Sequence, residues 1–392
     1  MKDSLYIAWR YVAYHRVKTA ILITAITFML FLPLALRTLV AACERQLMAR
    51  AASTPLIVGA KGSSLDLAID TLYFEPKPVD PITMAELQRV ERSGMARAVP
   101  IFTRFQARGR VIAGTTLDYF EFRNLVIDNG RQITRLGDCV LGATAAERLD
   151  LGPGDHLLSS PEDLFNLAGT FPLKMHVAGV LARSHTPDDH AVFVDIKTAW
   201  IIAGLGHGHQ DLQTVDDPDV LLRRDGRDYT ANAKLLHYNE ITEENIDSFH
   251  FHGDVSEFPI TAVLVIPRDK KSEDLLRGRY QSIGEPCQIL RPAHVIRDLT
   301  ATVFKVEGML NSAFVLTGGA ATMLIGLVVM LSLRLRHREV QTMFKLGCSR
   351  WKTAELLISE LLIIATASLL LTGLAVTLTT MYVDQILRRV IL

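Results

Sequence analysis

Three long stretches without a charged residue dominate the pattern of apolar and polar positions along the chain. They cover residues 20–36, 311–333 and 361–383. A helix that spans a bilayer needs about 20 consecutive apolar residues, and each stretch is at or near that length. The pattern therefore predicts three transmembrane helices.

The first apolar stretch could also be a secretory signal peptide, since basic residues precede it. The apolar region of a signal peptide is only about 7 to 15 residues long and ends at a small-residue cleavage site. This stretch is longer and reaches Arg37 without such a site. We interpret it as an uncleaved anchor. The residues before it predict an amphipathic helix whose apolar stripe is formed by Leu5, Ala8, Trp9 and Val12.

The long segment between the first two apolar stretches alternates strand and helix patterns. Strands are expected at TPLIVGA, LKMHVAGVLA, HAVFVDI and ITAVLVIP, and two more flank Gly109. Helices are expected from Pro81 to Arg92, with proline in the first position, and from about Ser272 to Tyr280. The segment is therefore predicted to be a mixed α/β domain.

Together these patterns predict an α-helical membrane bundle of three transmembrane helices plus a large mixed α/β extracytoplasmic domain. The expected order is a cytoplasmic amphipathic helix (1–18), transmembrane helix 1 (19–42), the α/β domain (43–305), transmembrane helix 2 (306–334), a cytoplasmic elbow (335–355), transmembrane helix 3 (356–383) and a C-terminal tail (384–392).

The charge distribution gives the orientation. Lys and Arg concentrate before the first apolar stretch and between the second and third, and such flanks face the cytoplasm. Residues 1–36 with 309–392 carry 12 Lys+Arg and 5 Asp+Glu, which leaves 30 and 37 for the rest, so the zero net charge is a sum of +7 and −7. A basic membrane part suits an anionic inner leaflet, and no nucleic-acid partner is expected. We expect a multi-pass protein of the inner (cytoplasmic) membrane with its N-terminus in the cytoplasm.

The link between the second and third apolar stretches reads LRLRHREVQTMFKLGCSRWKTAELLISE. It predicts a helix up to Leu346, a corner around Gly347, and a second helix from about Arg350 that carries Glu360 into the bilayer. The arginines alone would fit a loop that only sets the orientation. A Gly-Cys-Ser corner between two helices has no such explanation, so we interpret the link as a helical elbow beside the membrane.

This link resembles the RRREIAVLRALGASRRRIFRLFLLE segment of the FtsX/MacB-like family of ABC transporter permeases (type VII). The matching positions are Arg338, Glu339, Leu346, Gly347, Ser349 and Glu360. GAKGSSLDLAIDTLYF, VLGATAAERLDLGPGDHL and VAGVLARSHTPDDHAVFVDI are similar to parts of one branch of the family, and the order of helices and external domain is the family's layout. The resemblance covers nearly the whole chain.

The resemblance implies a non-catalytic permease subunit, with no cofactor of its own. ATP and Mg would be bound by a separate ABC ATP-binding subunit that docks on the elbow. The residues given this coupling role are Arg338, Glu339, Lys345, Leu346, Gly347, Ser349 and Glu360. A second permease copy in a homodimer, a periplasmic adaptor protein and membrane lipids are the other implied partners.

Two functions follow from the resemblance. The first is export or extraction of a lipophilic substrate by mechanotransmission, and the alternative is a signalling lever that activates an extracytoplasmic partner such as a cell-wall hydrolase. The family usually has a fourth transmembrane helix, whereas this sequence ends soon after the third, with Arg388 and Arg389. We expect either a three-helix variant or a shortened chain.

Residues 53–74 contain glycines, serines and a lysine that suggest a phosphate loop, but the spacing G-x-x-x-x-G-K-[ST] is absent from the chain. Two interpretations remain. In the first the stretch is a structural turn, in which the glycines permit a positive φ and Ser63 or Ser64 caps a helix that starts at Leu65. In the second it contacts a substrate or partner through Gly59, Lys61, Gly62 and Ser63.

Histidines and cysteines offer weaker signals. His185, His190, His207 and His209 lie among carboxylates at spacings that could hold a divalent metal, but loop histidines are common and no metal site is expected. No arrangement of Ser, His and Asp stands out as a hydrolase site. Cys139 and Cys287 would both lie outside the membrane, and the sequence leaves open whether they pair.

Overall fold

The computed structural model describes residues 2–160, 172–208, 221–225, 228–231, 239–282, 284–335, 337–345 and 347–390. The chain divides into two compact units, a helical unit of residues 1–46 with 300–391 and an α/β unit of residues 47–299. His209 and Leu346, both candidates from the sequence, lie outside the described residues.

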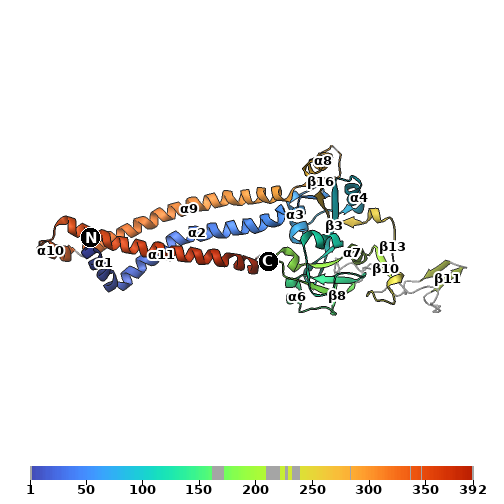
Figure 1. Ribbon diagram of the computed structural model, residues 1–392, viewed down its shortest axis with the longest axis horizontal. Coiled ribbons are helices and arrows are strands. Elements are labelled where there is room, and N and C mark those ends of the chain that lie inside the picture. The colour runs from blue at the N-terminus through green and yellow to red at the C-terminus, as the bar shows by residue number, and fades with distance from the viewer. Residues whose placement is uncertain are drawn as a thin grey trace. The chain divides into compact units, whose positions relative to one another are not determined.

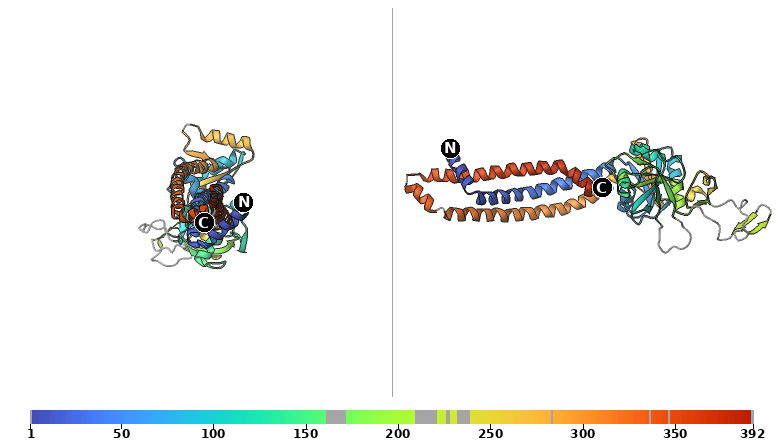
Figure 2. Two further views of the ribbon diagram at one scale, coloured as in Figure 1. Left: turned by 90° about the vertical axis from the view of Figure 1, so that its left-hand side faces the viewer. Right: turned by 90° about the horizontal axis from the view of Figure 1, so that it is seen from below.

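The helical unit is built from five helices. They are α1 (Lys2–Tyr14), α2 (Arg16–Ala52), α9 (Pro292–Leu335), α10 (His337–Lys345) and α11 (Arg350–Val390). Within the unit α2, α9 and α11 run side by side, as two views agree (Figures 1 and 2). Small residues allow this approach: the Ser368 hydroxyl of α11 lies 3.4 Å from the carbonyl oxygen of Ile23, and a Cβ on Gly318 of α9 would lie 3.4 Å from Met29.

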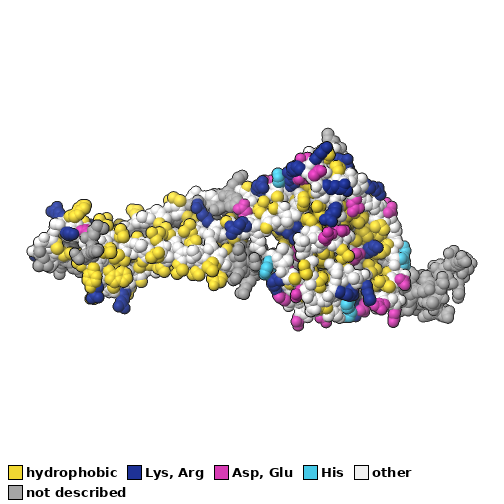
Figure 3. Space-filling view, viewed as in Figure 1, with side chains coloured by type: hydrophobic (Ala, Val, Ile, Leu, Met, Phe, Trp, Pro, Cys, Tyr) yellow, Lys and Arg dark blue, Asp and Glu magenta, His cyan; other side chains and the backbone are white. Residues whose placement is uncertain are grey.

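The surface of the helical unit is apolar along its length (Figure 3). Large exposed side chains include Phe28 and Leu32 on α2 and Leu362, Leu370 and Leu374 on α11. Within the described residues, α2 and residues 350–383 of α11 are long and apolar enough to cross a membrane. Residues 306–334 are helical within α9, and their crossing of the membrane stays a prediction.

The apolar stripe expected on α1 lies in two environments. Ala8 and Val12 are buried, together with Ser4, whereas Leu5 and Trp9 are exposed, as side chains that face a membrane surface would be. Val12 packs with Leu22 of α2 and Ile364 of α11. The buried face of α1 is therefore set by its contact with neighbouring helices, and Leu5 and Trp9 are left on the outer side. The position of α1 on the membrane surface stays a prediction.

The α/β unit is organised around one mixed, ten-stranded sheet. Its strand order is β16 (Cys287–Leu290), β1 (Leu56–Ala60), β15 (Ala262–Pro267), β3 (Ala96–Ala107), β4 (Arg110–Thr115), β9 (Val192–Asp195), β6 (Asp138–Leu141), β8 (Lys174–Leu181) and β5 (Ile127–Gly130), with β7 (His156–Leu158) also paired to β8. The β4–β9 and β6–β8 pairs are parallel and the others are antiparallel. This confirms the predicted mixed α/β class.

Helices cover both faces of this sheet. The six are α3 (Ser64–Tyr73), α4 (Met84–Arg92), α5 (Leu117–Arg123), α6 (Ala143–Leu149), α7 (Ile196–Ile202) and α8 (Lys270–Tyr280). Side chains alternate between two cores: Val192 and Val194 of β9 point into the core under α4, α7 and α8, and Phe193 points into the core under α3 and α5. Because both faces are buried, the central strands are continuous apolar runs.

Short elements complete the unit. They are the 3₁₀ turns η1 (Pro187–His190), η2 (Ile246–Ser248) and η3 (Val255–Glu257), and three two-stranded pairs: β2 (Ile82–Thr83) with β14 (Pro259–Ile260), β10 (Gly206–Gly208) with β13 (Phe249–Phe251), and β11 (Leu221–Asp225) with β12 (Asp228–Ala231).

The helix expected from Pro81 begins only at Met84. Ile82 and Thr83 form β2 instead, and the Met84 amide donates to the carbonyl oxygen of Phe258 at 2.9 Å. Pairing with a strand distant in sequence thus replaces the first helical turn.

Cys139 and Cys287 do not pair, and both thiols are free. Cys139 lies on β6 and Cys287 on the edge strand β16, and five strands of the sheet separate them.

Candidate functional site

The elbow is a corner closed by hydrogen bonds at both of its helix ends. Gly347 has a φ of +91°, its amide donates to Phe344 O at 3.0 Å, and the Cys348 amide donates to Met343 O at 3.0 Å. These two bonds form a Schellman motif at the end of α10, in which the left-handed position favours glycine. On the other side Ser349 caps α11, because its hydroxyl accepts from the Lys352 amide at 3.3 Å.

Most of the described elbow side chains face solvent. Lys345, Cys348 and Ser349 are exposed, and Trp351 is 81% exposed. Arg338 and Glu339 lie on α10, but the structure describes only their backbone. Trp351 is not among the residues that the sequence singled out, although a tryptophan directly after a predicted basic corner is a detectable signal.

Glu360 differs from the other elbow candidates because it is buried. It lies two to three turns into α11, and its carboxylate is 3.6 Å from the ammonium group of Lys18 on α2. This contact joins two helices of the helical unit. It points to a role in holding the bundle together next to the elbow.

A second site lies where α2 ends, in the α/β unit. Arg50 is buried and its two terminal nitrogens bind the carboxylate of Asp188 at 2.6 and 2.8 Å. Arg50 also donates to the Tyr119 hydroxyl at 2.8 Å and to Leu72 O at 3.2 Å, and that hydroxyl donates to Asp188 at 2.6 Å. We call Arg50, Tyr119 and Asp188 the Arg50 cluster.

The electrostatics of the Arg50 cluster favour the charged pair. Burial alone would raise the pKa of Asp188, but the charge and hydrogen bonds of Arg50 outweigh it and hold this pKa below its ordinary value. Burial raises the pKa of Tyr119, so that its hydroxyl remains a donor. Nothing in the local sequence marks these three residues, which come from α2, α5 and η1.

Further hydrogen bonds hold the C-terminal end of α2. Arg123 of α5 donates to the Ser53 hydroxyl at 3.0 Å and to the Thr54 hydroxyl at 2.7 Å. Tyr73 of α3 donates to Leu47 O at 2.7 Å. The last turn of α2 is therefore bound to α3, α5 and η1.

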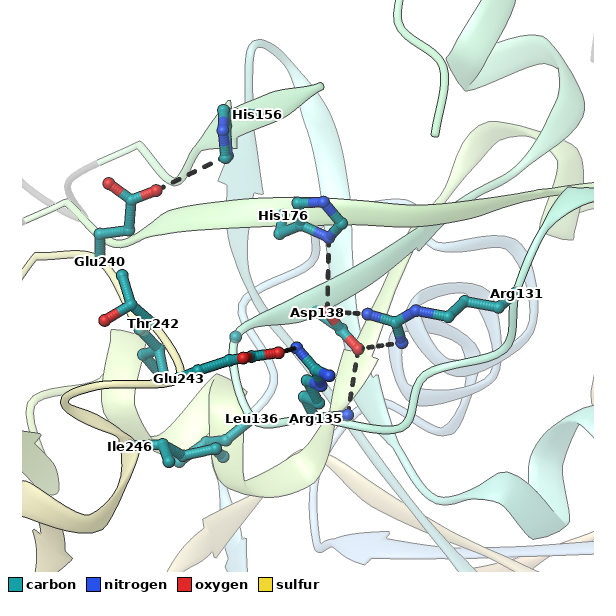
Figure 4. Close-up of a pocket in the computed structure, with 12 residues that line it drawn as sticks. Arg131, Arg135, Leu136, Asp138, His156, His176, Glu240, Thr242, Glu243 and Ile246 are labelled. Atoms are coloured by element: carbon teal, nitrogen blue, oxygen red, sulfur yellow. Dashed lines mark hydrogen bonds and ion pairs between the residues drawn. The ribbon is translucent and has the colours of Figure 1, made fainter. Parts of the chain in front are cut away.

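A polar pocket of about 570 Å³ lies beside β6, β7 and β8 (Figure 4). In it Asp138 pairs with Arg131 at 2.6 Å and lies 3.5 Å from His176, while Glu240 lies 3.8 Å from His156. Burial alone would raise the pKa of Asp138, but hydrogen bonds from Arg131 and two backbone amides lower it. The pocket is a charged recess suited to a polar ligand or a loop of a partner.

The glycine-rich stretch contains the helix cap of the first interpretation but not the positive φ expected of its glycines, because Gly59 lies on β1 and neither Gly59 nor Gly62 has a positive φ. Ser63 is the N-cap of α3 and accepts from the Asp66 amide at 3.1 Å. Gly59 lies under Leu67, where an added Cβ would come within 2.5 Å of a methyl group. Lys61 and Gly62 are exposed, so contact with a partner at these two positions stays a prediction.

The histidine candidates separate into two places. The carboxylates near His185 and His190 already have partners. Asp188 binds Arg50, and Asp189 accepts hydrogen bonds from the Ser184 hydroxyl and the His185 amide. His207 instead lies next to His250 and His252. His250 and His252 are not among the candidates from the sequence, although His-x-His occurs at residues 250–252 as it does at 207–209.

Comparison with known proteins identifies the family. A model described as the MacB-like periplasmic core domain matches residues 27–226, slightly more than half of the chain. The chain belongs to the MacB-like family of ABC transporter permeases. Members of this family are generally non-catalytic permease subunits of inner-membrane ABC transporters, with the ATPase on a partner.

Two solved structures are similar to this MacB-like chain. The periplasmic region of MacB from Actinobacillus actinomycetemcomitans is 10% identical, covering 64% of this chain and 97% of that one, with a TM-score of 0.36. The extracellular domain of the noncanonic ABC-type transporter YknZ from Gram-positive bacteria is 13% identical, covering 60% and 98%, with a TM-score of 0.32. No curated protein matches the sequence.

Proposed function

We propose that this chain is a permease subunit that converts ATP hydrolysis by a separate ABC subunit into movement of its own α/β unit. ATP and Mg bind to that partner subunit, which docks on the elbow. The observation that carries the proposal is the elbow itself: a corner capped on both sides resists bending, and its exposed Trp351 offers an anchor of the type enriched at interfaces.

The path of α2 supports a mechanical role. It is one helix from Arg16 to Ala52, and its last turn is buried through Arg50. Pro33 lies inside α2 and removes one helical hydrogen bond, but a continuous helix whose end is bound by a buried ion pair can transmit displacement better than a flexible linker. In a homodimer the two α/β units would move to export or extract a lipophilic substrate, with a periplasmic adaptor as a further partner.

The elbow can be tested with a matched pair of glycine substitutions. An added Cβ at Gly347 meets no atom within 4 Å, so we expect the main effect of Gly347→Val to be the cost of a β-branched residue at φ +91°, on the order of 1 kcal/mol or more. Gly373→Val, on α11 and also without neighbours, makes the same change outside the left-handed region. We expect Gly347→Val, Trp351→Ala and Glu339→Lys to release the ATP-binding subunit on co-purification and to abolish transport. Gly373→Val should do neither.

Folding and coupling can be separated in the same experiment. Resistance of the α/β unit to trypsin should be unchanged in the elbow variants. Arg50→Lys keeps the charge but loses the two-pronged contact, so it should retain the ATP-binding subunit and its ATPase activity while transport falls. Full association and transport in all three elbow variants would show that the elbow only sets orientation.

The polar pocket favours a second candidate, the signalling lever. Its described lining is rich in charged groups, including Arg131, Arg135, Glu240 and Glu243, which suit a polar loop of a partner better than an acyl chain. Co-purification in mild detergent tests this: a cell-wall hydrolase retained by the native chain and lost in Arg135→Glu supports the lever, and retention of an adaptor alone supports transport.

A further inference from the structure

Three histidines converge on the small sheet formed by β10 and β13. His207 lies on β10, His250 on β13 and His252 directly after it. Each offers a ring nitrogen, and these nitrogens all lie within 4.8 Å of one another. The ring centroids are 4.7 to 4.9 Å apart.

Strand pairing explains why the three rings meet. His207 is paired with His250 across the antiparallel ladder, and His252 follows two residues later, so all three share one face. Phe249 and Phe251 occupy the other face, where their rings lie over Gly208 and Gly206: an added Cβ would come within 2.6 and 2.7 Å of them.

The phenylalanine face turns toward the core. Phe249 and Phe251 pack against the main hydrophobic cluster, and the ring of Phe251 is 6.4 Å from that of Trp200. The imidazoles are therefore directed away from the core. His207 and His250 are half-buried and His252 is exposed, so the group is accessible to an ion from solvent.

We propose that His207, His250 and His252 bind a Zn²⁺ ion through three imidazole nitrogens, with the fourth position open to water or an external ligand. Imidazole is a preferred zinc ligand, and three protein ligands with one open position is a common zinc arrangement. Zn–N bonds of about 2.0–2.1 Å place ligand nitrogens roughly 3.4 Å apart in a tetrahedron. Binding would draw nitrogens that already lie within 4.8 Å of one another to that spacing.

One ring is already oriented for this role. Nδ1 of His250 lies 3.0 Å from the carbonyl oxygen of Ser248, and because a carbonyl only accepts, Nδ1 must carry the proton. In that neutral tautomer the lone pair is on Nε2. A backbone carbonyl that fixes the tautomer in this way is typical of zinc-binding histidines.

The site would tie together two segments that are distant in sequence. Residues 206–208 and 249–251 are joined by a three-residue antiparallel pairing, which a hydrogen bond from the His252 amide to Leu205 O extends. An ion that binds the folded arrangement and not the unfolded chain stabilises it in proportion to its affinity. The site is independent of the elbow and of ATP coupling.

The test uses the full chain in detergent, stripped of metal with a chelator and then titrated with ZnCl₂ alone. We expect one Zn²⁺ retained per chain after gel filtration, and a rise in Tm on binding. His207→Ala, His250→Ala and His252→Ala should each weaken binding at least about tenfold. His294→Ala removes an exposed histidine elsewhere in the α/β unit and should bind like the native chain.

Hydrogen exchange distinguishes a variant that loses Zn²⁺ binding from one that only weakens the pairing of β10 with β13. In the native chain Zn²⁺ should slow exchange at the backbone amides of residues 206–208 and 249–251. His252 lies outside the paired residues, so His252→Ala should keep the zinc-free exchange rates and lose the slowing by Zn²⁺. The absence of saturable binding would overturn the proposal, as would unchanged affinity in all three variants.

Discussion

Arg50 and Asp188, which are 138 residues apart in sequence, form a buried two-pronged ion pair between the end of α2 and η1. The nitrogen–oxygen distances are 2.6 and 2.8 Å, and the Tyr119 hydroxyl binds both partners. Two charges without water are stabilised only by each other and by their hydrogen bonds. The pair therefore specifies which part of the α/β unit the helix end must contact.

Removing Arg50 should destabilise the α/β unit strongly. Arg50→Ala leaves Asp188 buried without its counter-charge, and we expect a loss of about 3–5 kcal/mol in the free energy of unfolding. In a domain of this size that corresponds to a fall in Tm of about 10 °C, measurable by thermal unfolding of the full chain in detergent. Arg45→Ala, at an exposed position of the same helix, should change Tm little.

A double substitution isolates the pair itself. Arg50→Met combined with Asp188→Leu removes both charges, so it should be less destabilising than Arg50→Ala. If the single and double variants both unfold within about a degree of the native chain, the pair has no structural role.

Asp70 should make stability depend on pH in the opposite direction from a salt-bridged acid. It is buried, it accepts from the Thr103 hydroxyl at 2.6 Å, and burial raises its pKa to about 6. The folded state thus holds the proton more tightly than the unfolded chain, whose Asp has a pKa of about 3.9. The contribution of Asp70 to stability is present below about pH 4 and is lost as the pH rises to about 6.

Asp70→Asn removes this ionisation. We expect the variant to be more stable than the native chain at pH 7, by up to roughly 3 kcal/mol, and not at pH 4. Unfolding midpoints measured at both pH values test this, with Asp128→Asn at an exposed position of β5 as the control for charge. An equal effect of Asp70→Asn at both pH values would show that folding does not raise the pKa of Asp70.

Gly142 should tolerate no side chain. An added Cβ would lie 2.3 Å from the backbone oxygen of Asp188 and 2.5 Å from that of Asp189. Because backbone cannot rotate away as a side chain can, Gly142→Ala should displace η1 and cost about 3 kcal/mol. Gly62→Ala, which meets no atom within 4 Å, should be nearly neutral in the same unfolding assay. Similar midpoints for the two variants would contradict the close approach at Gly142.

The topology can be tested by labelling thiols, provided that the cysteines are accessible. Cys139 is fully buried, so it cannot report on its side of the membrane, whereas Cys348 is exposed. In intact cells a membrane-impermeant thiol reagent should label Lys61→Cys, an exposed external position, and should reach Cys348 only after permeabilisation. The labelled variant would carry Cys43→Ser to remove a partly exposed thiol. Labelling of Cys348 but not of Lys61→Cys in intact cells would show that the orientation is the opposite of the predicted one.

The features that the sequence predicted are those encoded by neighbouring residues. The helical elbow follows from a Gly-Cys-Ser corner, because the φ of +91° at Gly347 and the cap at Ser349 depend only on nearby atoms. The cap at Ser63 and the β3–β4 turn at Gly109 are local in the same sense, and both are confirmed. The apolar length of α2 and α11 is likewise a property of composition.

The features that only tertiary structure decided depend on residues brought together from far along the chain. The helix α4 begins only at Met84, whose amide donates to the carbonyl oxygen of Phe258. On α1, Ser4 is buried and Leu5 is exposed because neighbouring helices cover the side of Ser4. Arg50 contacts Asp188 because the end of α2 packs on the α/β unit. His207 lies beside His250 and His252 because β10 pairs with β13. A residue's local sequence determines its preferred backbone conformation, but burial, ion pairing and metal geometry depend on which distant surfaces pack against it.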